Sequence, residues 1–233
     1  MEQNIEMKKQ SLSTASMLTA IGATLMYGLS ILFGFIAPEG LSVVSIIGLI
    51  LLIVGLYNLS TALRGIKDTV ATPFKGMFKA IVMMVGAAIV YVILLNILRG
   101  AMDFDNIGTI VTVIKIATIA LIVAIILFTN KLRAASMTLS KNGLKSMKHC
   151  GVAYTIQLVI CCIVGLVVFI ALFSTGRGAS FLGSLGLEGS MGLISALTVV
   201  LVLATITMCV FMLIGWWKVR GELQRLTDAP AQA

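Results

Sequence analysis

Charged residues are scarce in this chain: they make up 11% of its 233 residues, against about 25% in ordinary soluble proteins. Hydrophobic residues make up 59%, and the mean hydropathy is +1.10. A soluble domain cannot bury so large an apolar share, which excludes an ordinary globular fold. We therefore expect an all-α integral membrane protein, because a helix satisfies its own backbone hydrogen bonds inside a bilayer.

Acidic residues are missing from every long apolar run. The chain has nine Asp and Glu, and each of them falls in a tail or a connection. Inside the apolar runs this excludes carboxylate proton relays, carboxylate-bound sodium sites and the paired carboxylates of a glycosidase. The sequence also lacks a Gly-rich phosphate loop that ends in Lys-Ser or Lys-Thr. We expect neither an enzyme nor a bound cofactor.

Histidine and cysteine are also few. His149 is the single histidine, so a bis-histidine haem within the chain is excluded. Cys150, Cys161, Cys162 and Cys209 lie within or at the edge of apolar runs, which argues against a disulfide framework outside the membrane and against a metal site. We interpret the neighbouring Cys161 and Cys162 as packing residues rather than a redox pair.

The apolar residues gather in six runs of roughly 19–25 residues, each long enough to cross a hydrocarbon core about 30 Å thick. They predict a compact bundle of six transmembrane helices between a tail at 1–14 and a tail at 218–233. The first run is longer than the core of a signal peptide, and Pro38 follows it where a cleavage site would need small residues, so we expect it to be retained. The predicted spans are about 15–37, 41–63, 80–98, 108–129, 151–173 and 193–217.

The connection at 64–79 fits two structures. Ile66, Val70, Phe74 and Phe78 recur every four residues, which is typical of an amphipathic helix lying on the membrane surface. The same residues also fit the end of one span followed by the start of the next. In either case Pro73 is expected to break the helix into two pieces.

Two further connections carry turn signals. Asn142 and Gly143 tolerate the left-handed conformation, so we expect the helix of the fourth span to end there. The Gly-rich stretch 174–192 fits either a re-entrant segment or a flexible connection.

Basic residues predict the orientation. Outside the spans only Arg99 and Arg177 lie on one side, and every other Lys and Arg lies on the side of both tails. The positive-inside rule therefore places both termini in the cytoplasm of a cell whose plasma membrane holds the chain, most simply a bacterial inner membrane. With a net charge of +8, we expect anionic lipid headgroups rather than nucleic acid as partners. The predicted headgroup contacts are Arg64, Lys67, Lys75, Lys79, Lys131, Arg133, Lys141, Lys145 and Lys148.

Helices in a bilayer associate through small and polar residues that permit close approach. Such residues recur at spacings of three and four in four of the runs, which predicts left-handed crossings in a compact bundle. The predicted seams are Ser16, Ala20, Ala23, Tyr27, Ser30 and Gly34; Ala117, Ala120 and Ala124; Cys150, Tyr154, Gln157 and Cys161; and Ser195, Thr198, Thr205 and Cys209.

Lys115 is the one charged residue inside a predicted span. A lysine at the centre of a helix costs about 2.5–3.5 kcal/mol on insertion, and this one lies about 10 Å from the outer end. It either snorkels or pairs with Asp103 or Asp105, or it serves a solute or a proton. Asn96 and Gln157 are the other polar residues at depth, and we expect them to make interhelical hydrogen bonds.

Short connections and the lack of intramembrane acids favour a non-enzymatic assembly or regulatory subunit that acts through helix–helix contacts. Its partner would be another membrane protein or a second copy of the chain. The alternative is a small transporter or channel for an anionic solute that uses Lys115. A membrane enzyme acting on lipid fits less well, because the basic connections supply no acid, base or nucleophile.

Overall fold

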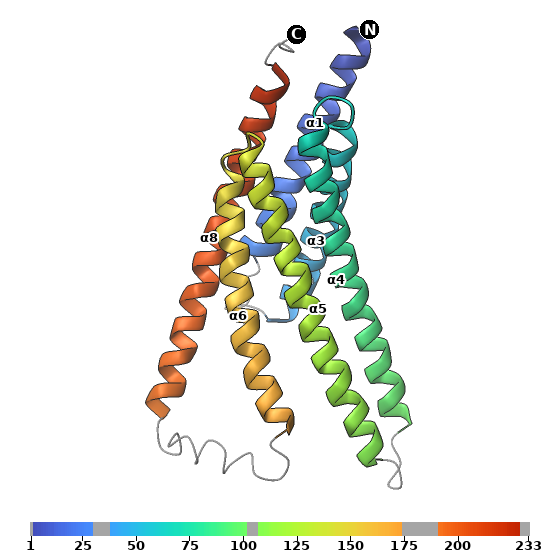
Figure 1. Cartoon of the computed structure of the whole chain (residues 1–233), viewed down its shortest axis with the longest axis vertical. Coiled ribbons are helices and arrows are strands. Elements are labelled where there is room, and N and C mark those ends of the chain that lie inside the picture. Colours follow the sequence, from blue (N-terminus) through green and yellow to red (C-terminus); the bar gives the residue numbers. More distant parts are fainter. Residues whose placement is uncertain (1, 30–37, 102–106, 174–190, 229–233) are drawn as a thin grey trace.

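The structure is a computed structural model that describes residues 2–29, 38–101, 107–173 and 191–228 (Figure 1). In these ranges five helices are long and apolar enough to cross a membrane. The predicted all-helical fold is confirmed, and five of the predicted spans lie in those helices; the first, 15–37, ends at residues outside the described ranges. The elements are α1 (Glu2–Ala23), the π-helix η1 (Thr24–Leu29), α3 (Pro38–Ala62), α4 (Asp68–Gly100), α5 (Ile107–Lys141), α6 (Met147–Phe173) and α8 (Met191–Asp228).

Helix α4 decides between the two structures that fit the connection at 64–79. A tight turn with a positive φ of 80° at Gly65 leads directly into α4, whose first turns take up the rest of the segment. The segment is therefore the start of the next span, and no separate surface helix forms. Gly143, with a φ of 107°, follows the end of α5 at Lys141 as predicted.

The expected break at Pro73 was wrong, because α4 runs through it without interruption. A proline in a helix lacks the N–H that would bond to the carbonyl four residues earlier, here that of Thr69. Asn142 lies in the turn between α5 and α6, and its Nδ2 donates to the Thr69 oxygen at 2.7 Å. The freed carbonyl thus has a partner from another part of the chain.

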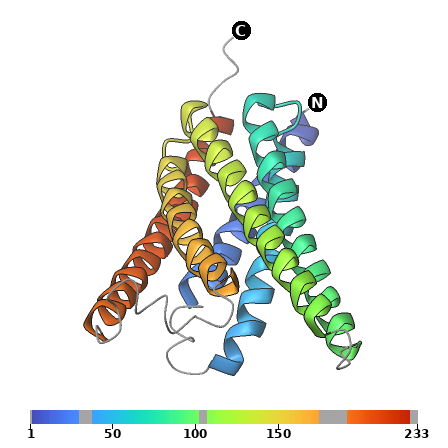
Figure 2. The same cartoon turned by 60° about the horizontal axis from the view of Figure 1, so that its bottom comes forward.

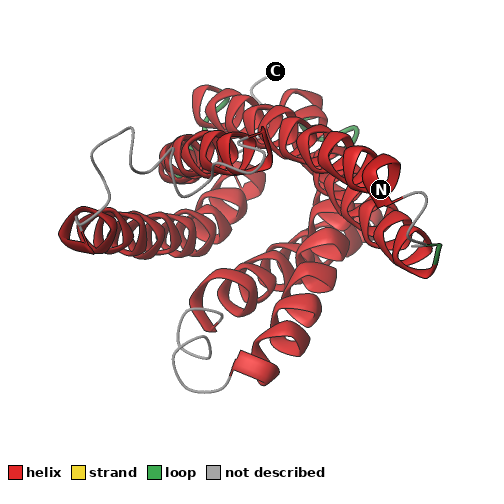
Figure 3. Ribbon diagram, turned by 90° about the horizontal axis from the view of Figure 1, so that it is seen from below, coloured by secondary structure: helices red, strands yellow, loops and turns green. Residues whose placement is uncertain are grey.

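The helices form a ring in chain order. Each packs against the next, and α8 returns to pack against α1 and η1. Both chain ends and both described turns lie at one end of the molecule, and toward the other end the α4–α5 pair diverges from α6 and α8 (Figures 1 and 2). Viewed from that other end, the helices spread apart (Figure 3).

Burial divides the ring into two halves. The closed half comprises 7–28, 48–81, 128–154 and 208–225, and it holds nearly all the buried side chains of the described residues. The open half comprises 82–101, 107–127, 155–169 and 198–207, where Ile110 and Gly165 are the buried exceptions among the described residues. The core of the closed half is built from large side chains, among them Trp216, Tyr154, Phe74, Leu139, Met147 and Met212.

Glycines bring α1 and α3 into close contact in the closed half. A Cβ added at Gly22 would lie 2.5 Å from the backbone nitrogen of Leu52, and one added at Gly48 would lie 2.6 Å from that of Met26. No side chain fits at either distance, so the two backbones touch as in other small-residue helix pairs of membranes. The indole of Trp217 in α8 adds a hydrogen bond, from Nε1 to the Thr24 hydroxyl at 3.0 Å.

The predicted seams are buried only where they run through the closed half. Ser16, Ala20, Ala23 and Tyr27 are buried, as are Cys150, Tyr154 and Cys209. The members in the open half are exposed or half-buried: Ala117, Ala120, Ala124, Gln157, Cys161, Thr198 and Thr205. Ser30 and Gly34 lie outside the described residues, and the side chain of Ser195 is also outside them.

Candidate functional site

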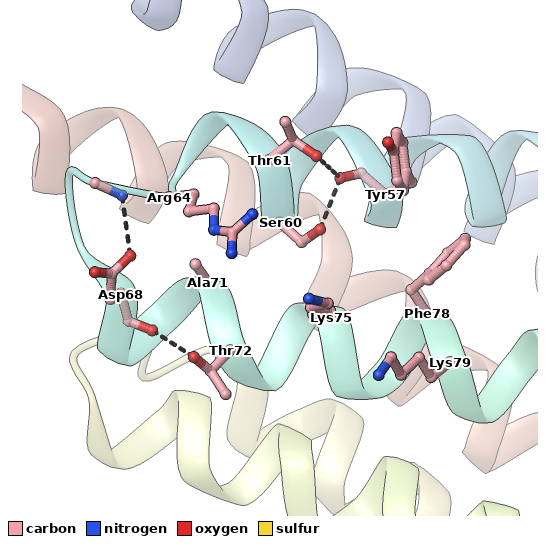
Figure 4. A pocket seen from close by; sticks show the side chains of 11 residues that line it. Tyr57, Ser60, Thr61, Arg64, Asp68, Ala71, Thr72, Lys75, Phe78 and Lys79 are labelled. Atoms are coloured by element: carbon pink, nitrogen blue, oxygen red, sulfur yellow. Dashed lines mark hydrogen bonds between the residues drawn. The ribbon is translucent and has the colours of Figure 1, made fainter.

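The turn between α3 and α4 borders a cavity of about 760 Å³, which we call the α3–α4 pocket (Figure 4). The last turns of α3 form one wall and the first three turns of α4 form the other, because the short turn folds the two helices back antiparallel. Buried Ser60 and Ala71 lie at its base, and Arg64, Lys75 and Lys79 line it. The pocket therefore gathers three of the nine predicted headgroup contacts.

The three cations of the pocket have no acidic partner among the described residues. Asp68 is the only acid in the lining, and its Oδ1 accepts a hydrogen bond from the Gly65 N–H at 2.9 Å. In Figure 4 the Arg64 guanidinium lies between the two helices, while the Asp68 carboxylate is turned toward the chain reversal. The pocket thus carries a net positive charge that no side chain in it neutralises.

Four hydroxyl groups also line the pocket, and three of them already donate to the backbone. Ser60 Oγ and Thr61 Oγ1 donate to the Tyr57 carbonyl at 2.8 and 3.0 Å, and Thr72 Oγ1 donates to the Asp68 carbonyl at 3.0 Å. Each hydroxyl has a single hydrogen to give. An anion in the pocket would therefore be held mainly by the cations, with the Tyr57 hydroxyl as the remaining hydroxyl donor.

An aromatic pair closes the end of the pocket farthest from the turn. The rings of Tyr57 and Phe78 lie 5.5 Å apart between centroids and are tilted by 52°. Lys79 follows Phe78 directly and precedes the predicted apolar run 80–98. Cations and aromatic rings directly beside an apolar run are typical of the membrane–water interface.

The turn between α5 and α6 differs, because an acid from α8 occupies it. Both carboxylate oxygens of Glu222 accept from the Ser146 N–H at 3.1 Å, and Oε1 also accepts from the Ser146 hydroxyl at 2.7 Å. Glu222 thereby caps the N-terminus of α6, where a negative charge is favourable. No sequence pattern predicts this contact, since Ser146 and Glu222 are far apart in the chain.

The remaining predicted headgroup contacts lie outside the pocket. Lys67 is half-buried in the turn between α3 and α4, and Arg133 is half-buried on α5. Lys131 lies over the Phe128 ring, with Nζ 5.6 Å from the centroid. Lys141, Lys145 and Lys148 are exposed around the turn between α5 and α6.

Lys115 is half-buried in the open half of α5. Thr118, three residues further on, lies opposite Tyr91 of α4, with their oxygens 2.9 Å apart. Because the Thr118 hydroxyl donates to the Ile114 carbonyl at 2.8 Å, Tyr91 is the donor in this pair. Ile122, seven residues after Lys115 and on the same face, contacts α6 at Gly165. Lys115 thus shares the face that α5 turns to its neighbours.

The other polar candidates are less well placed. Asp103 and Asp105 lie outside the described residues, so pairing of either with Lys115 stays a prediction. Asn96 is exposed, and the buried Oε1 of Gln157 has no hydrogen-bond partner. The interhelical bond expected of Gln157 is therefore not seen at this oxygen.

Within the described ranges, no three His, Cys, Asp or Glu side chains are close enough to hold a metal ion. His149 packs its ring against that of Phe211, with centroids 6.0 Å apart, and all four cysteines are free thiols. The buried Cys150 and Cys209 lie in the packed core, whereas Cys162 is exposed.

Sequence reasoning found the pocket cations but could not single them out among nine basic residues. What distinguishes Arg64, Lys75 and Lys79 is the antiparallel return of α4 beside α3, which brings residues from both sides of a turn to one cavity. The chain matches no protein-family model, no curated protein and no solved structure.

Proposed function

We propose that this protein is a non-enzymatic subunit of a plasma-membrane assembly, with both termini in the cytoplasm, and that its open half binds a partner through helix–helix contacts. The basic residues around the closed half support this orientation through the positive-inside rule. The bacterial inner membrane is the simplest setting for such a chain. The partner is a second membrane protein or a second copy of this chain.

One observation carries the proposal: the faces that pack in the closed half continue into the open half without being covered. On α4 the buried stripe of Phe74, Met77 and Ile81 continues at Ala88 and Val92, and both are exposed. On α8 the buried stripe of Cys209, Met212 and Trp216 continues at Val202 and Thr198, which are also exposed. Lipid covers outward faces in any membrane protein, but these faces continue the inward ones.

A small residue on α4 adds to this argument. Ala88, which continues the buried stripe, has only a methyl side chain and is exposed. Small residues at a helix surface allow another helix to approach closely. The partner helix is therefore expected on this stretch of α4.

Native mass spectrometry of the protein, released in small lipid discs from its own membrane, tests the proposal. We expect a stoichiometric second polypeptide or a second copy. An Ala88→Trp substitution should remove it, while Met137→Trp, on the closed half of α5, should retain it. A monomer that carries only lipid, or a partner that both variants retain equally, would contradict the proposal.

A transporter or channel for a small anion is the second candidate, and the position of Lys115 favours it. This half-buried cation lies on the same face of α5 as Thr118, in the half where the ring opens. Uptake of chloride, phosphate and small carboxylates into proteoliposomes tests it. Lys115→Leu should abolish uptake and Lys115→Arg should retain part of it. If no anion enters with the native chain, or if the Leu variant transports normally, this candidate is wrong.

A further inference from the structure

We infer that the α3–α4 pocket binds the phosphate headgroup of an anionic phospholipid in the membrane leaflet on the side of the chain termini. The inference concerns a different surface from the proposed partner contact, and it requires only that the chain spans a bilayer.

Charge is the first reason. Arg64 lies in the turn just after α3 and Lys75 lies on α4, and both line one cavity with Lys79. Like charges gathered in one cavity repel each other, and the described residues bring no acid to pair with these three. Asp68 is held at the turn by the Gly65 N–H. An anion between the helices would remove the repulsion.

The kind of donor narrows the class of anion. All but one of the lining hydroxyls give their hydrogens to backbone carbonyls, which leaves one guanidinium, two ammonium groups and the Tyr57 hydroxyl as donors. A guanidinium binds phosphate oxygens in pairs, and lysine binds phosphate as a point charge. This donor set suits a phosphate better than a neutral, hydroxyl-rich headgroup.

The surroundings of the pocket distinguish a lipid from a soluble phosphate. Beyond the Tyr57–Phe78 pair, the exposed face of α3 continues through Val54 and Ile50, and that of α4 continues through Val82. These residues form an apolar surface that begins where the cations end. A phospholipid has this arrangement of a charged head followed by acyl chains, whereas inorganic phosphate would leave the apolar surface unused.

The α3–α4 turn and the α5–α6 turn differ in whether another helix supplies a carboxylate. At the turn between α5 and α6, Glu222 supplies a carboxylate to Ser146 from another helix. No equivalent carboxylate reaches the α3–α4 pocket from any other helix among the described residues. In the first turn, the anion is therefore expected to come from outside the protein.

The test uses the full chain, delipidated in detergent and titrated with dioleoyl phosphatidylglycerol or phosphatidylcholine, with native mass spectrometry as the readout. Each basic residue near a membrane surface contributes about fivefold to the affinity for anionic lipid. We expect phosphatidylglycerol to bind the native chain about tenfold or more tightly than phosphatidylcholine. The triple variant R64Q/K75Q/K79Q should lose this preference.

The matched control is the triple variant K141Q/K145Q/K148Q, which removes the same charge from exposed positions around the second turn. It should keep most of the preference, and both variants should keep the helical circular dichroism of the native chain. Equal loss in both would show that overall charge is responsible and would overturn the inference.

A separate arm tests soluble phosphate. Inorganic phosphate at about 10 mM should not displace bound phosphatidylglycerol, because it cannot use the apolar surface beside the pocket. Displacement would assign the pocket to a soluble anion instead. The absence of any preference in the native chain would also overturn the inference, whatever the result of the partner experiment on Ala88.

Discussion

The closed and open halves of the ring are continuous stretches of the same helices, yet they differ in how closely their helices pack. Both halves are apolar, so hydropathy does not separate them. The closed half combines glycine contacts between α1 and α3 with large interlocking side chains and with polar links such as Glu222 to Ser146. The open half keeps apolar surface without that complementarity. Apolar character thus brings a helix into a membrane, whereas shape decides which part of it packs.

The most direct test of this difference replaces one glycine in each half with leucine. Gly22→Leu places a side chain where the Leu52 backbone lies, and we expect it to cost at least about 3 kcal/mol or to prevent folding. At Gly86 an added Cβ meets nothing within 4 Å, and leucine improves helix propensity, so the stability of Gly86→Leu should be unchanged or higher by up to about 1 kcal/mol.

Unfolding by denaturing detergent, followed by circular dichroism, measures both variants in the same mild micelle. Similar losses at the two glycines would mean that the open half is as tightly packed as the closed half. The distinction between the halves would then fail.

A leucine deletion in each half of α5 is the next test. Leu139 is fully buried in the closed half, whereas Leu127, at the edge of the open half, is 57% exposed. Leu139→Ala should therefore cost about 2–5 kcal/mol through lost contacts and a cavity, and Leu127→Ala less than about 1 kcal/mol. The same unfolding assay applies. If Leu127→Ala costs as much as Leu139→Ala, a partner or a tightly bound lipid covers the open half in the micelle.

The sequence alone predicts some features of this fold and not others. Long apolar runs predict the helices, and Gly143 predicts the end of α5, because both depend on local chemistry. The path through Pro73 could not be predicted, because it depends on Asn142, which lies far along the chain. The two halves could not be separated either, since Ala88 of the open half looks in sequence like Ala23 of the closed half.

The candidate site follows the same rule. Patterns of charge predict Arg64, Lys75 and Lys79 as headgroup contacts, but equally with six other basic residues. Only the antiparallel packing of α3 and α4 separates them from those six. Lys115 is a candidate from the sequence alone, because a charged residue inside an apolar run is evident without a structure.

Hydrogen bonds that link two parts of the chain allow a finer comparison of the two halves. Glu222→Ala removes the cap of α6 and leaves the Ser146 groups without their acceptor, which should cost about 1–3 kcal/mol. Ser146→Ala provides the partner for a double-mutant cycle, with a coupling energy near 1 kcal/mol expected. In the open half, Tyr91→Phe removes the hydrogen bond to Thr118 and should cost about 0.6 kcal/mol. A larger loss from Tyr91→Phe than from Glu222→Ala would reverse the expected order of the two halves.

The smallest expected effect concerns Pro73 and Asn142. Asn142→Ala removes the hydrogen bond to the Thr69 carbonyl and should cost about 1 kcal/mol. In a Pro73→Ala background, the new N–H at position 73 can bond to the same carbonyl, so Asn142→Ala should cost clearly less there. Comparing the two backgrounds cancels any separate effect of Asn142 on the end of α5. Equal costs in both would show that the proline does not free the carbonyl for Asn142. In that case, the unbroken course of α4 through Pro73 would need another explanation. The closed half would also have one stabilising polar contact fewer than the distances indicate.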